Sequence, residues 1–381
     1  MAGNRKKSAG ESGADLPAGS FDWPRFLGRP AASIDCERAE EALAGRSVLI
    51  TGAGGSIGSA LSLRVAAFAP RELILLDASS KKLRKTGDRL ARRFQRLRRT
   101  ASHGDICDLS MLRQLFRSRR PEVVFHAAAL KYVPSLERNP FAAMRNNALA
   151  TAELAKIAAE HRAERFVFVS TDKAADPHSA LGASKRIAEL ALLTEGPAAM
   201  RRRAVRLVNV LGSSGSVVPL FLRQIRRGGP VTITHRQARR YFLPLEETVA
   251  LLLEACAEGA GDGLLVPQPG RPVTVARLAR FLIRQTAGPR AVPIAFTALR
   301  PGDKVRESLI SRRERYCGGA SGRERSLRRV KSPTLPAPEV DALFGRIGEA
   351  CRAGSRKRLL EAILSGVPEY RPSRLMRNLP A

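Results

Sequence analysis

Three residues that could transfer protons stand side by side in the middle of the chain. Thr171, Asp172 and Lys173 offer a hydroxyl, a carboxylate and an amine directly after the apolar run 165–169. That run predicts a buried parallel strand, and open α/β sheets place their ligands at the carboxyl ends of such strands. A helix cap or a surface ion pair is the structural alternative. Three polar groups at one strand end favour catalysis, so we predict that these residues are catalytic.

A second segment with chemical potential follows and ends in Lys185. Residues 181–185 read Leu-Gly-Ala-Ser-Lys, which has the outline of the Tyr-x-x-x-Lys pair of short-chain dehydrogenases, with Leu181 in the place of the tyrosine. In that pattern the lysine lies on a helix beneath the nicotinamide ribose. The alternative is an ordinary solvated helix lysine. We predict that Lys185 is catalytic and binds cofactor, in a chain that lacks the usual acid–base residue.

A glycine-rich turn predicts a dinucleotide site. Residues 51–58 read Thr-Gly-Ala-Gly-Gly-Ser-Ile-Gly, between an expected strand at 47–51 and an expected helix at 56–68. Glycines in this context allow a tight turn and a close approach to a pyrophosphate, which the helix N-terminus attracts. A tight turn without a ligand is the alternative. The residues expected to hold the cofactor here are Gly52, Gly55, Ser56, Ile57 and Gly58.

An acidic residue at the end of the next strand favours NAD as the cofactor. Asp77 ends the expected strand at 72–76, about 20 residues after the glycines, where an acid holds the adenosine ribose. A carboxylate at this place repels the 2′-phosphate of NADP. Lys81, Lys82 and Arg84 follow closely enough to leave NADP open.

Two further strand ends complete the expected cofactor site. Asp105 and Ile106 follow the third strand and could meet the adenine edge. Ala127 and Ala128 end the fourth strand, at 123–125, where small side chains would let the cofactor lie flat on the sheet. Alanines are equally good core packing, and His126 beside them is expected to be a hydrogen-bonded core histidine.

The elements that must position these residues alternate between strand and helix. Alternation of this kind predicts an α/β fold of the Rossmann type, with a doubly wound parallel sheet. We expect a flexible basic leader at 1–40 with one short docked piece at 23–27, then an NAD(P)-binding domain at 41–212. A smaller, mixed substrate-binding region with a basic tail would occupy 213–381, and its chain could cross back to the sheet. The expected strands are 47–51, 72–76, 123–125, 166–169, 204–210 and 231–234; the expected helices are 56–68, 81–97, 140–160, 184–193, 217–227, 246–258, 275–286 and 355–364.

The composition excludes several classes of protein. The net charge of +31 implies an acidic partner, such as a nucleotide diphosphate or an anionic membrane surface. Aromatic residues make up 5% of the chain, too few for a stacking platform, so no specific nucleic-acid role is expected. The arginine-rich stretches 90–99 and 201–206 read as solvated helix surface.

We predict a cytoplasmic location from the cysteines, the histidines and the apolar runs. Five scattered cysteines form no C-x-x-C pair and do not cluster with the histidines, so neither a disulfide framework nor a metal site is predicted. No apolar run reaches the roughly 18–20 residues of a membrane span, and no apolar signal core opens the chain.

These motifs together resemble the CapD-like polysaccharide-biosynthesis proteins, which are extended short-chain dehydrogenases that include UDP-N-acetylglucosamine 4,6-dehydratases. The similarity runs from about residue 27 to residue 372. The resemblance implies the soluble portion or a short form of the family, whose membrane-linked branch commonly has methionine at the position of Leu181. Homo-oligomers are common in this family. Besides the segments already described, the matching motifs are 126–131, 182–186, 209–213, 215–219, 229–232 and 300–304.

The resemblance also implies a mechanism. Oxidation at C4 of the sugar would pass hydride to the nicotinamide and acidify the C5 proton. Lys173, with a depressed pKa, would remove that proton, and Asp172 would act as the general acid on the C6 hydroxyl. Thr171 would orient the C4 hydroxyl in the absence of a tyrosine. Hydride would then return to C6.

On the substrate side, the resemblance points to one lysine, one asparagine and two arginines. Asn209 would hold the diphosphate or sugar, Arg240 and Arg300 would clamp the diphosphate, and Lys131 would reach the sugar or its phosphate. The expected activity is a UDP-sugar 4,6-dehydratase. The alternatives are a nucleotide-sugar epimerase, which uses the same oxidised intermediate, and a cofactor-binding or nucleic-acid-associated protein that has lost the chemistry.

Overall fold

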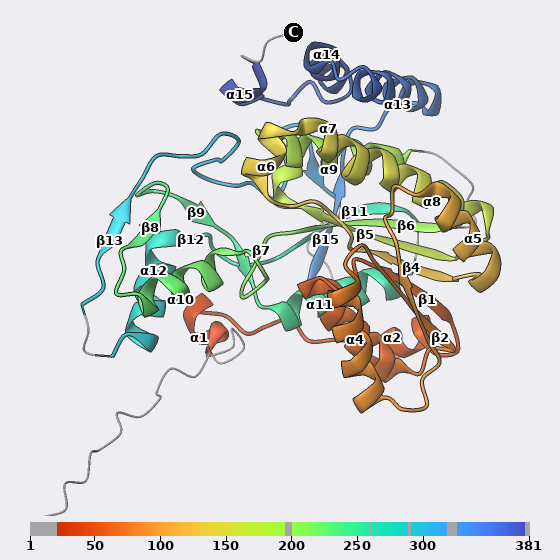
Figure 1. Cartoon of the computed structure of the whole chain (residues 1–381), viewed down its shortest axis with the longest axis horizontal. Coiled ribbons are helices and arrows are strands. Elements are labelled where there is room, and N and C mark those ends of the chain that lie inside the picture. The colour runs from red at the N-terminus through yellow and green to blue at the C-terminus, as the bar shows by residue number, and fades with distance from the viewer. Residues whose placement is uncertain (1–20, 195–199, 260, 289–290, 318–325, 378–381) are drawn as a thin grey trace, which may run out of the picture.

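The protein is built on one long central sheet (Figure 1). This computed structural model describes residues 21–194, 200–259, 261–288, 291–317 and 326–377. Nine strands of the described chain follow the order β14-β15-β11-β6-β5-β4-β1-β2-β3. From β3 to β11 all neighbours are parallel, while β15 and β14 run antiparallel at the C-terminal edge. The predicted Rossmann-type doubly wound sheet is therefore confirmed.

The strands of the large sheet are β1 (Ser47–Thr51), β2 (Glu72–Asp77), β3 (Arg99–His103), β4 (Val123–His126), β5 (Arg165–Thr171), β6 (Arg201–Leu207), β11 (Gly263–Pro267), β14 (Arg315–Tyr316) and β15 (Leu327–Lys331). Short pairs elsewhere join β7 (Asn209–Val210) to β10 (Phe242–Leu243), β8 (Val231–Ile233) to β13 (Ile294–Phe296), and β9 (Arg239–Arg240) to β12 (Val273–Thr274). The helices are α1 (Trp23–Leu27), α2 (Cys36–Leu43), α3 (Ser56–Val65), α4 (Ser80–Arg93), α5 (Leu109–Arg119), α6 (Val133–Arg138), α7 (Pro140–Ala143), α8 (Ala150–Glu160), α9 (Ala180–Leu193), α10 (Val217–Arg226), α11 (Leu245–Ala257), α12 (Val275–Thr286), α13 (Ala337–Arg352), α14 (Arg356–Gly366) and α15 (Arg374–Arg377).

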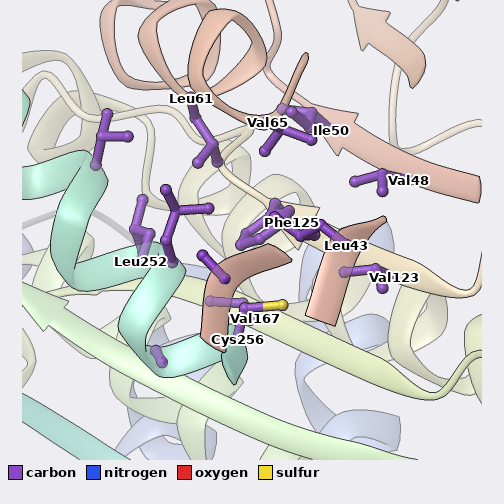
Figure 2. Close-up of a cluster of buried hydrophobic side chains, with 14 of the residues drawn as sticks. Leu43, Val48, Ile50, Leu61, Val65, Val123, Phe125, Val167, Leu252 and Cys256 are labelled. Carbon is purple, nitrogen blue, oxygen red and sulfur yellow. The ribbon is translucent and has the colours of Figure 1, made fainter. Parts of the chain in front are cut away.

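Apolar side chains on both faces of the strands fix the three-layer architecture. All five residues of β1 are buried, which is typical of a parallel strand covered on both sides. On one face, side chains of α2, α3, α4 and α11 pack on the sheet, and Figure 2 shows Leu43, Leu61 and Leu252 meeting Ile50 and Phe125. On the other face, α5, α8 and α9 form a second apolar layer.

A smaller lobe stands at the carboxyl ends of the strands. Its apolar core joins α1, α10, α12 and β8 and includes Trp23, Phe26 and Phe221. The expectation of a flexible leader up to residue 40 is wrong for residues 21–40. Aromatic contacts dock α1, with the Phe26 ring centroid 4.6 Å from that of Phe281, and α2 joins the main core. The short docked piece expected at 23–27 is confirmed, and residues 1–20 lie outside the described chain.

The C-terminal part of the chain returns to the nucleotide-binding layer. β11 and β15 extend the large sheet, and α13 and α14 pack on the outer side of α9. In Figure 1 both helices lie beyond the layer of α7 and α9. The sequence predicted one helix in this stretch, at 355–364, which α14 matches. It missed α13 and β15.

The arginine-rich stretch 201–206 is not a solvated helix. It forms β6, in which Arg203 and Arg206 are buried. Arg202 pairs with Asp262 at 2.5 Å, and Arg206 bridges Glu189 and Glu314, each at 2.6 Å. A central strand can carry these charges because every buried guanidinium here meets a carboxylate.

Candidate active site

A cavity of about 1480 Å³ lies between the carboxyl ends of the strands and the smaller lobe. The sheet reverses its order between β1 and β4, and open α/β sheets bind ligands at such a switch point. With the exception of Asp172, every residue predicted to act in catalysis, cofactor binding or substrate binding lines this cavity. These residues are Gly52, Gly55, Ser56, Ile57, Gly58, Asp77, Asp105, Ile106, Ala127, Ala128, Lys131, Thr171, Lys173, Lys185, Asn209, Arg240 and Arg300.

The glycine turn between β1 and α3 is packed so closely that side chains do not fit. Gly52 has a left-handed φ of 68°, and a Cβ added there would stand 2.7 Å from the amide nitrogen of Ala128. A Cβ on Gly58 would stand 2.1 Å from the carbonyl oxygen of Gly52. No side chain caps the N-terminus of α3, so its first amides are left for an anionic ligand.

Asp77 shapes the same turn from the end of β2. Its Oδ2 accepts a hydrogen bond from the Gly54 amide at 2.9 Å, and its Oδ1 accepts one from the Ser79 amide at 2.8 Å. The carboxylate therefore ties the glycine turn to the start of α4 while it lines the cavity. In this geometry the carboxylate can also accept a hydrogen bond from a ribose hydroxyl.

His126 has a structural role. Its Nδ1 lies 2.7 Å from the Thr51 hydroxyl and its Nε2 lies 2.9 Å from the Thr151 hydroxyl. Burial lowers the pKa of His126 to about 3, and the charge of Lys185 acts in the same direction. The imidazole is therefore neutral and joins β1, β4 and α8, as expected for a core histidine.

Thr171, Asp172 and Lys173 form one hydrogen-bonded group at the end of β5. Asp172 Oδ1 accepts from the Thr171 hydroxyl at 3.0 Å and from Lys173 Nζ at 2.9 Å. The Asp172 side chain is fully buried, and its Oδ2 has no hydrogen-bond partner among the residues that the structure describes. Thr171 and Lys173 line the cavity, whereas Asp172 lies behind them. The role of Asp172 as general acid on the C6 hydroxyl, which the resemblance implies, stays a prediction, and Asp172 would have to act through a neighbouring group.

The expected depression of the Lys173 pKa is wrong for this arrangement. Burial acts to lower the pKa of the Lys173 amine, but the charges of Asp172 and Glu307 outweigh burial and raise it. Glu307 Oε1 lies 3.8 Å from Lys173 Nζ. Two carboxylates therefore face this amine and hold it as an ammonium.

Lys185 carries the depressed pKa instead. Its Nζ donates to the Val169 carbonyl at 2.9 Å and lies 4.4 Å from the centroid of the Phe168 ring. Burial lowers the pKa of Lys185 to about 7, while the charge of Glu189 opposes this shift. The amine therefore exchanges its proton near neutral pH at the wall of the cavity.

Helix α9 begins at Ala180, so Leu181 belongs to its first turn and the helix starts four residues before the predicted position. Leu181 packs with Val133, Leu136 and Ala180 in a small apolar cluster and also lines the cavity. The position thus remains apolar and offers no proton.

Gly182 sets how closely α9 approaches the catalytic loop, and this predicts the effect of a methyl group there. A Cβ on Gly182 would stand 2.2 Å from the Lys173 carbonyl oxygen. We expect Gly182→Ala to lower the free energy of unfolding by about 1–3 kcal/mol, because α9 must move away from the loop. Urea unfolding measures this loss. Gly87→Ala in α4 is the control, since a Cβ there meets nothing within 4 Å. Equal stability of the two variants would contradict the prediction.

The predicted substrate residues also line the cavity. Asn209 donates through Nδ2 to the Tyr241 carbonyl at 3.1 Å. Arg240 donates to the backbone carbonyls of Lys304 at 2.7 Å and Val305 at 3.1 Å, which fixes its guanidinium at the cavity wall. Arg300 pairs with Asp303 through Nε at 2.9 Å.

The family of polysaccharide biosynthesis proteins matches residues 48–321, which contain the glycine turn, the catalytic group and Arg300. The chain belongs to this family. Among curated relatives, it is 39% identical over 294 residues to the probable polysaccharide biosynthesis protein EpsC of Bacillus subtilis, and 38% identical over 293 residues to the capsular polysaccharide biosynthesis protein CapD of Staphylococcus aureus. Each match covers 76% of this chain and 49% of the relative, so the chain spans about half the length of these two proteins.

Solved structures share the fold seen for this family member. Pen from Bacillus thuringiensis is 25% identical, with a TM-score of 0.68 over 77% of this chain and 90% of that one. DesIV, a dTDP-glucose 4,6-dehydratase from Streptomyces venezuelae with NAD and TYD bound, is 22% identical, with a TM-score of 0.60 over 69% and 87%. A UDP-glucose 4-epimerase from Thermotoga maritima with UDP-glucose is 22% identical, with a TM-score of 0.57 over 69% and 89%.

The sequence did not single out several residues that the family fold brings to the site. Glu307 is the most notable, because it lies beside Lys173 although 134 positions separate the two in the chain. The smaller lobe adds cavity-lining residues, among them Ser214, Arg223 and Thr232. Of these, Thr232 lies in the motif at 229–232, for which the sequence predicted no role of individual residues. In the described part of the chain, no three His, Cys, Asp or Glu side chains gather as metal ligands, and no helix has the length and apolar character to cross a membrane.

Proposed function

We propose that the chain is a nucleotide-sugar 4,6-dehydratase that acts on UDP-N-acetylglucosamine or a close relative. The observation that carries this proposal is the hydrogen-bonded Thr171-Asp172-Lys173 group on a cavity that also contains a dinucleotide turn. Elimination of water needs an acid and a base close together, and this group contains both. The relatives EpsC and CapD support a role in polysaccharide biosynthesis.

The residues present fit a nicotinamide cofactor, with NAD favoured over NADP. The side-chain-free turn at Gly52, the uncapped N-terminus of α3 and the Asp77 carboxylate provide the places for a pyrophosphate and a ribose. Ala127 and Ala128 leave room along the sheet, and Asp105 and Ile106 border the adenine end. A nicotinamide bound here would accept hydride from C4 of the sugar and return it to C6.

The ion pair of Lys173 and Asp172 can supply the base and the acid by moving one proton. A proton that passes along the 2.9 Å hydrogen bond from Lys173 Nζ to Asp172 Oδ1 leaves a neutral amine and a neutral carboxylic acid. The amine then takes the C5 proton, the C5–C6 double bond forms, and the C6–oxygen bond breaks. When Asp172 has given its proton to the leaving oxygen, the original ion pair is restored and water has been formed.

Thr171 connects the buried Asp172 to the cavity. Its hydroxyl lies 3.0 Å from Asp172 Oδ1 and belongs to a cavity-lining residue. The hydroxyl can donate to the leaving C6 oxygen while it receives the proton of Asp172, so the buried acid acts without direct contact. The Lys185 amine, with its pKa of about 7, would accept the proton of the C4 hydroxyl in the absence of a tyrosine.

Arg240 and Arg300 on the cavity wall would bind the diphosphate of the substrate, and Lys131 and Asn209 would contact the sugar or its phosphate. Two neighbouring structures carry nucleotide or sugar-nucleotide ligands, TYD in DesIV and UDP-glucose in the Thermotoga epimerase. A homo-oligomer, a cytoplasmic location and contact with an anionic membrane stay predictions.

Mass spectrometry of the reaction product tests the proposal. Purified protein incubated with UDP-N-acetylglucosamine and NAD is expected to release a product lighter by one water. A product of unchanged mass that separates as a new sugar isomer would replace the dehydratase with an epimerase. Absence of turnover with all UDP-hexoses tried, despite bound NAD, would leave the non-catalytic alternative.

A further inference from the structure

A second carboxylate, Glu307, lies next to the catalytic group and has no role in the steps described so far. It follows the Arg300–Asp303 turn, and its side chain is 3% exposed. Within this buried corner it lies close to three cations: Lys304 at 3.3 Å, Lys173 at 3.8 Å and Arg240 at 4.0 Å. Burial lowers the pKa of the nearby His178 imidazole, and the charge of Glu307 opposes this shift.

Glu307 is ionised in spite of its burial. Burial acts to raise the pKa of its carboxyl, but the charges of Lys173, Lys304 and Arg240 outweigh burial and lower it. A buried carboxylate with three cations near it is compensated, and such a group contributes more to geometry than to stability.

Among its three cations, Lys173 depends most on Glu307. Lys304 Nζ also donates to the Ala175 carbonyl at 2.7 Å, and Arg240 donates to the carbonyls of Lys304 and Val305. Both cations are thus held by backbone oxygens. In the described chain, Lys173 Nζ has one hydrogen-bond partner, Asp172, and Glu307 is the second anion that faces it.

We propose that Glu307 is a positioning residue that fixes the Lys173 ammonium beside Asp172 and controls when this amine can become a base. The proposal rests on the function proposed above. Glu307 stabilises the charged form of the Lys173–Asp172 pair and so opposes the internal proton transfer that produces the neutral amine. Arg240 lines the substrate cavity, and its positive charge acts to lower the pKa of Lys173. Because Arg240 is also proposed to bind the diphosphate, substrate binding is linked to the charge of Lys173.

The same segment also holds the loop that follows the catalytic group. Lys304 donates to the Ala175 carbonyl, and the Ser311 hydroxyl donates to Asp176 Oδ1 at 2.7 Å. Residues 304–311 therefore fasten the loop at two points while Glu307 faces Lys173 between them. A shift of the Arg300 turn would therefore move Glu307 relative to Lys173, the proposed base.

Glu307→Gln tests the proposal through the protonation of Lys173. Trace acetylation at a series of pH values, read by mass spectrometry of the Lys173 peptide, gives the pH at which the amine is half deprotonated. Loss of the Glu307 charge removes stabilisation of the ammonium, so we expect this midpoint to fall by about one pH unit. The alkaline limb of the pH profile for dehydration should move in the same direction, because a Lys173 that has lost its proton cannot pass one to Asp172.

Glu247→Gln is the matched control, because Glu247 is an equally buried carboxylate, 4% exposed, that pairs with Arg29 away from the cavity. An unchanged midpoint in Glu307→Gln, or an equal fall in Glu247→Gln, would overturn the assignment. If Glu307→Gln does not fold, Glu307→Asp keeps the negative charge at a greater distance from Lys173. The pH at which Lys173 is half deprotonated must then lie below that of the wild type. A fall of the midpoint in a protein that dehydrates no UDP-sugar would reject the proposed function and leave the control of Lys173 by Glu307 standing.

Discussion

Replacing Lys173 with methionine is expected to lower the rate of UDP-sugar dehydration by about a thousand-fold or more while NAD remains bound. Loss of a positioned base or acid costs roughly 10²–10⁴-fold, and Lys173 is proposed to supply the base and, through Asp172, the proton of the acid. Methionine has a similar length and no charge, so it keeps the shape of the cavity wall. Stopped-flow or mass-spectrometric rates measure turnover, and quenching of protein fluorescence measures cofactor binding.

Lys173→Arg separates the two roles of the amine. Arginine keeps the positive charge between Asp172 and Glu307 but does not lose its proton in proteins. We expect it to be as inactive as the methionine variant. Activity within tenfold of the wild type in either variant would show that Lys173 is not the base. Recovery in the arginine variant alone would mean that the charge is sufficient.

The nucleotide half of the site was predictable because its signals are local. Strand β1 has the predicted bounds, and the turn from Gly52 to Gly58 is specified by glycines that no other residue can replace at these contacts. Asp77, Ala127 and Ala128 follow directly because each stands at the end of a buried parallel strand. In such a sheet, the position along the chain almost determines the position in space.

The catalytic surroundings were less predictable because they depend on contacts between distant segments. Asp172 lies in the hydrogen-bonded group with Thr171 and Lys173, but its burial behind Thr171 follows from the packing of α9 on the loop, which Gly182 permits. Glu307 comes from an irregular segment whose path no periodic pattern indicates. The sign of the Lys173 pKa shift was predicted wrongly for the same reason, since Glu307 faces this amine from a distant part of the chain.

Arg206 shows how charge in the sequence can mislead when its partners are distant. It looked like part of a solvated arginine run, yet its side chain is fully buried and hydrogen-bonded to both Glu189 and Glu314. The hydroxyl of Ser170, beside Thr171 in β5, donates to the same Glu189 at 2.6 Å. The network therefore connects the catalytic strand end with α9 and with the segment that contains Glu314.

The pH dependence of this network has a defined sign. Burial acts to raise the pKa of Glu314, but the charge and hydrogen bonds of Arg206 outweigh burial and lower it from 4.5 to about 2. A carboxyl whose pKa is depressed by folding contributes stability above its unfolded value, near 4.5, and this contribution is lost as the pH falls towards 2. The free energy of unfolding of the wild type should therefore fall between pH 4.5 and about pH 2. This fall should depend on the presence of Arg206.

Arg206→Ala is accordingly expected to lower the free energy of unfolding by about 3–5 kcal/mol at neutral pH, since it leaves two buried carboxylates without their main partner. Urea unfolding at pH 7 and pH 3 measures the effect, and the loss should be smaller at pH 3, where Glu314 without Arg206 is protonated. Arg313→Ala is the control, because the Arg313 side chain is 51% exposed and, within the described residues, its one ion pair is with Glu369. A loss below about 1 kcal/mol for Arg206→Ala at both pH values would mean that water reaches the two carboxylates and that the buried network does not hold the catalytic strand end.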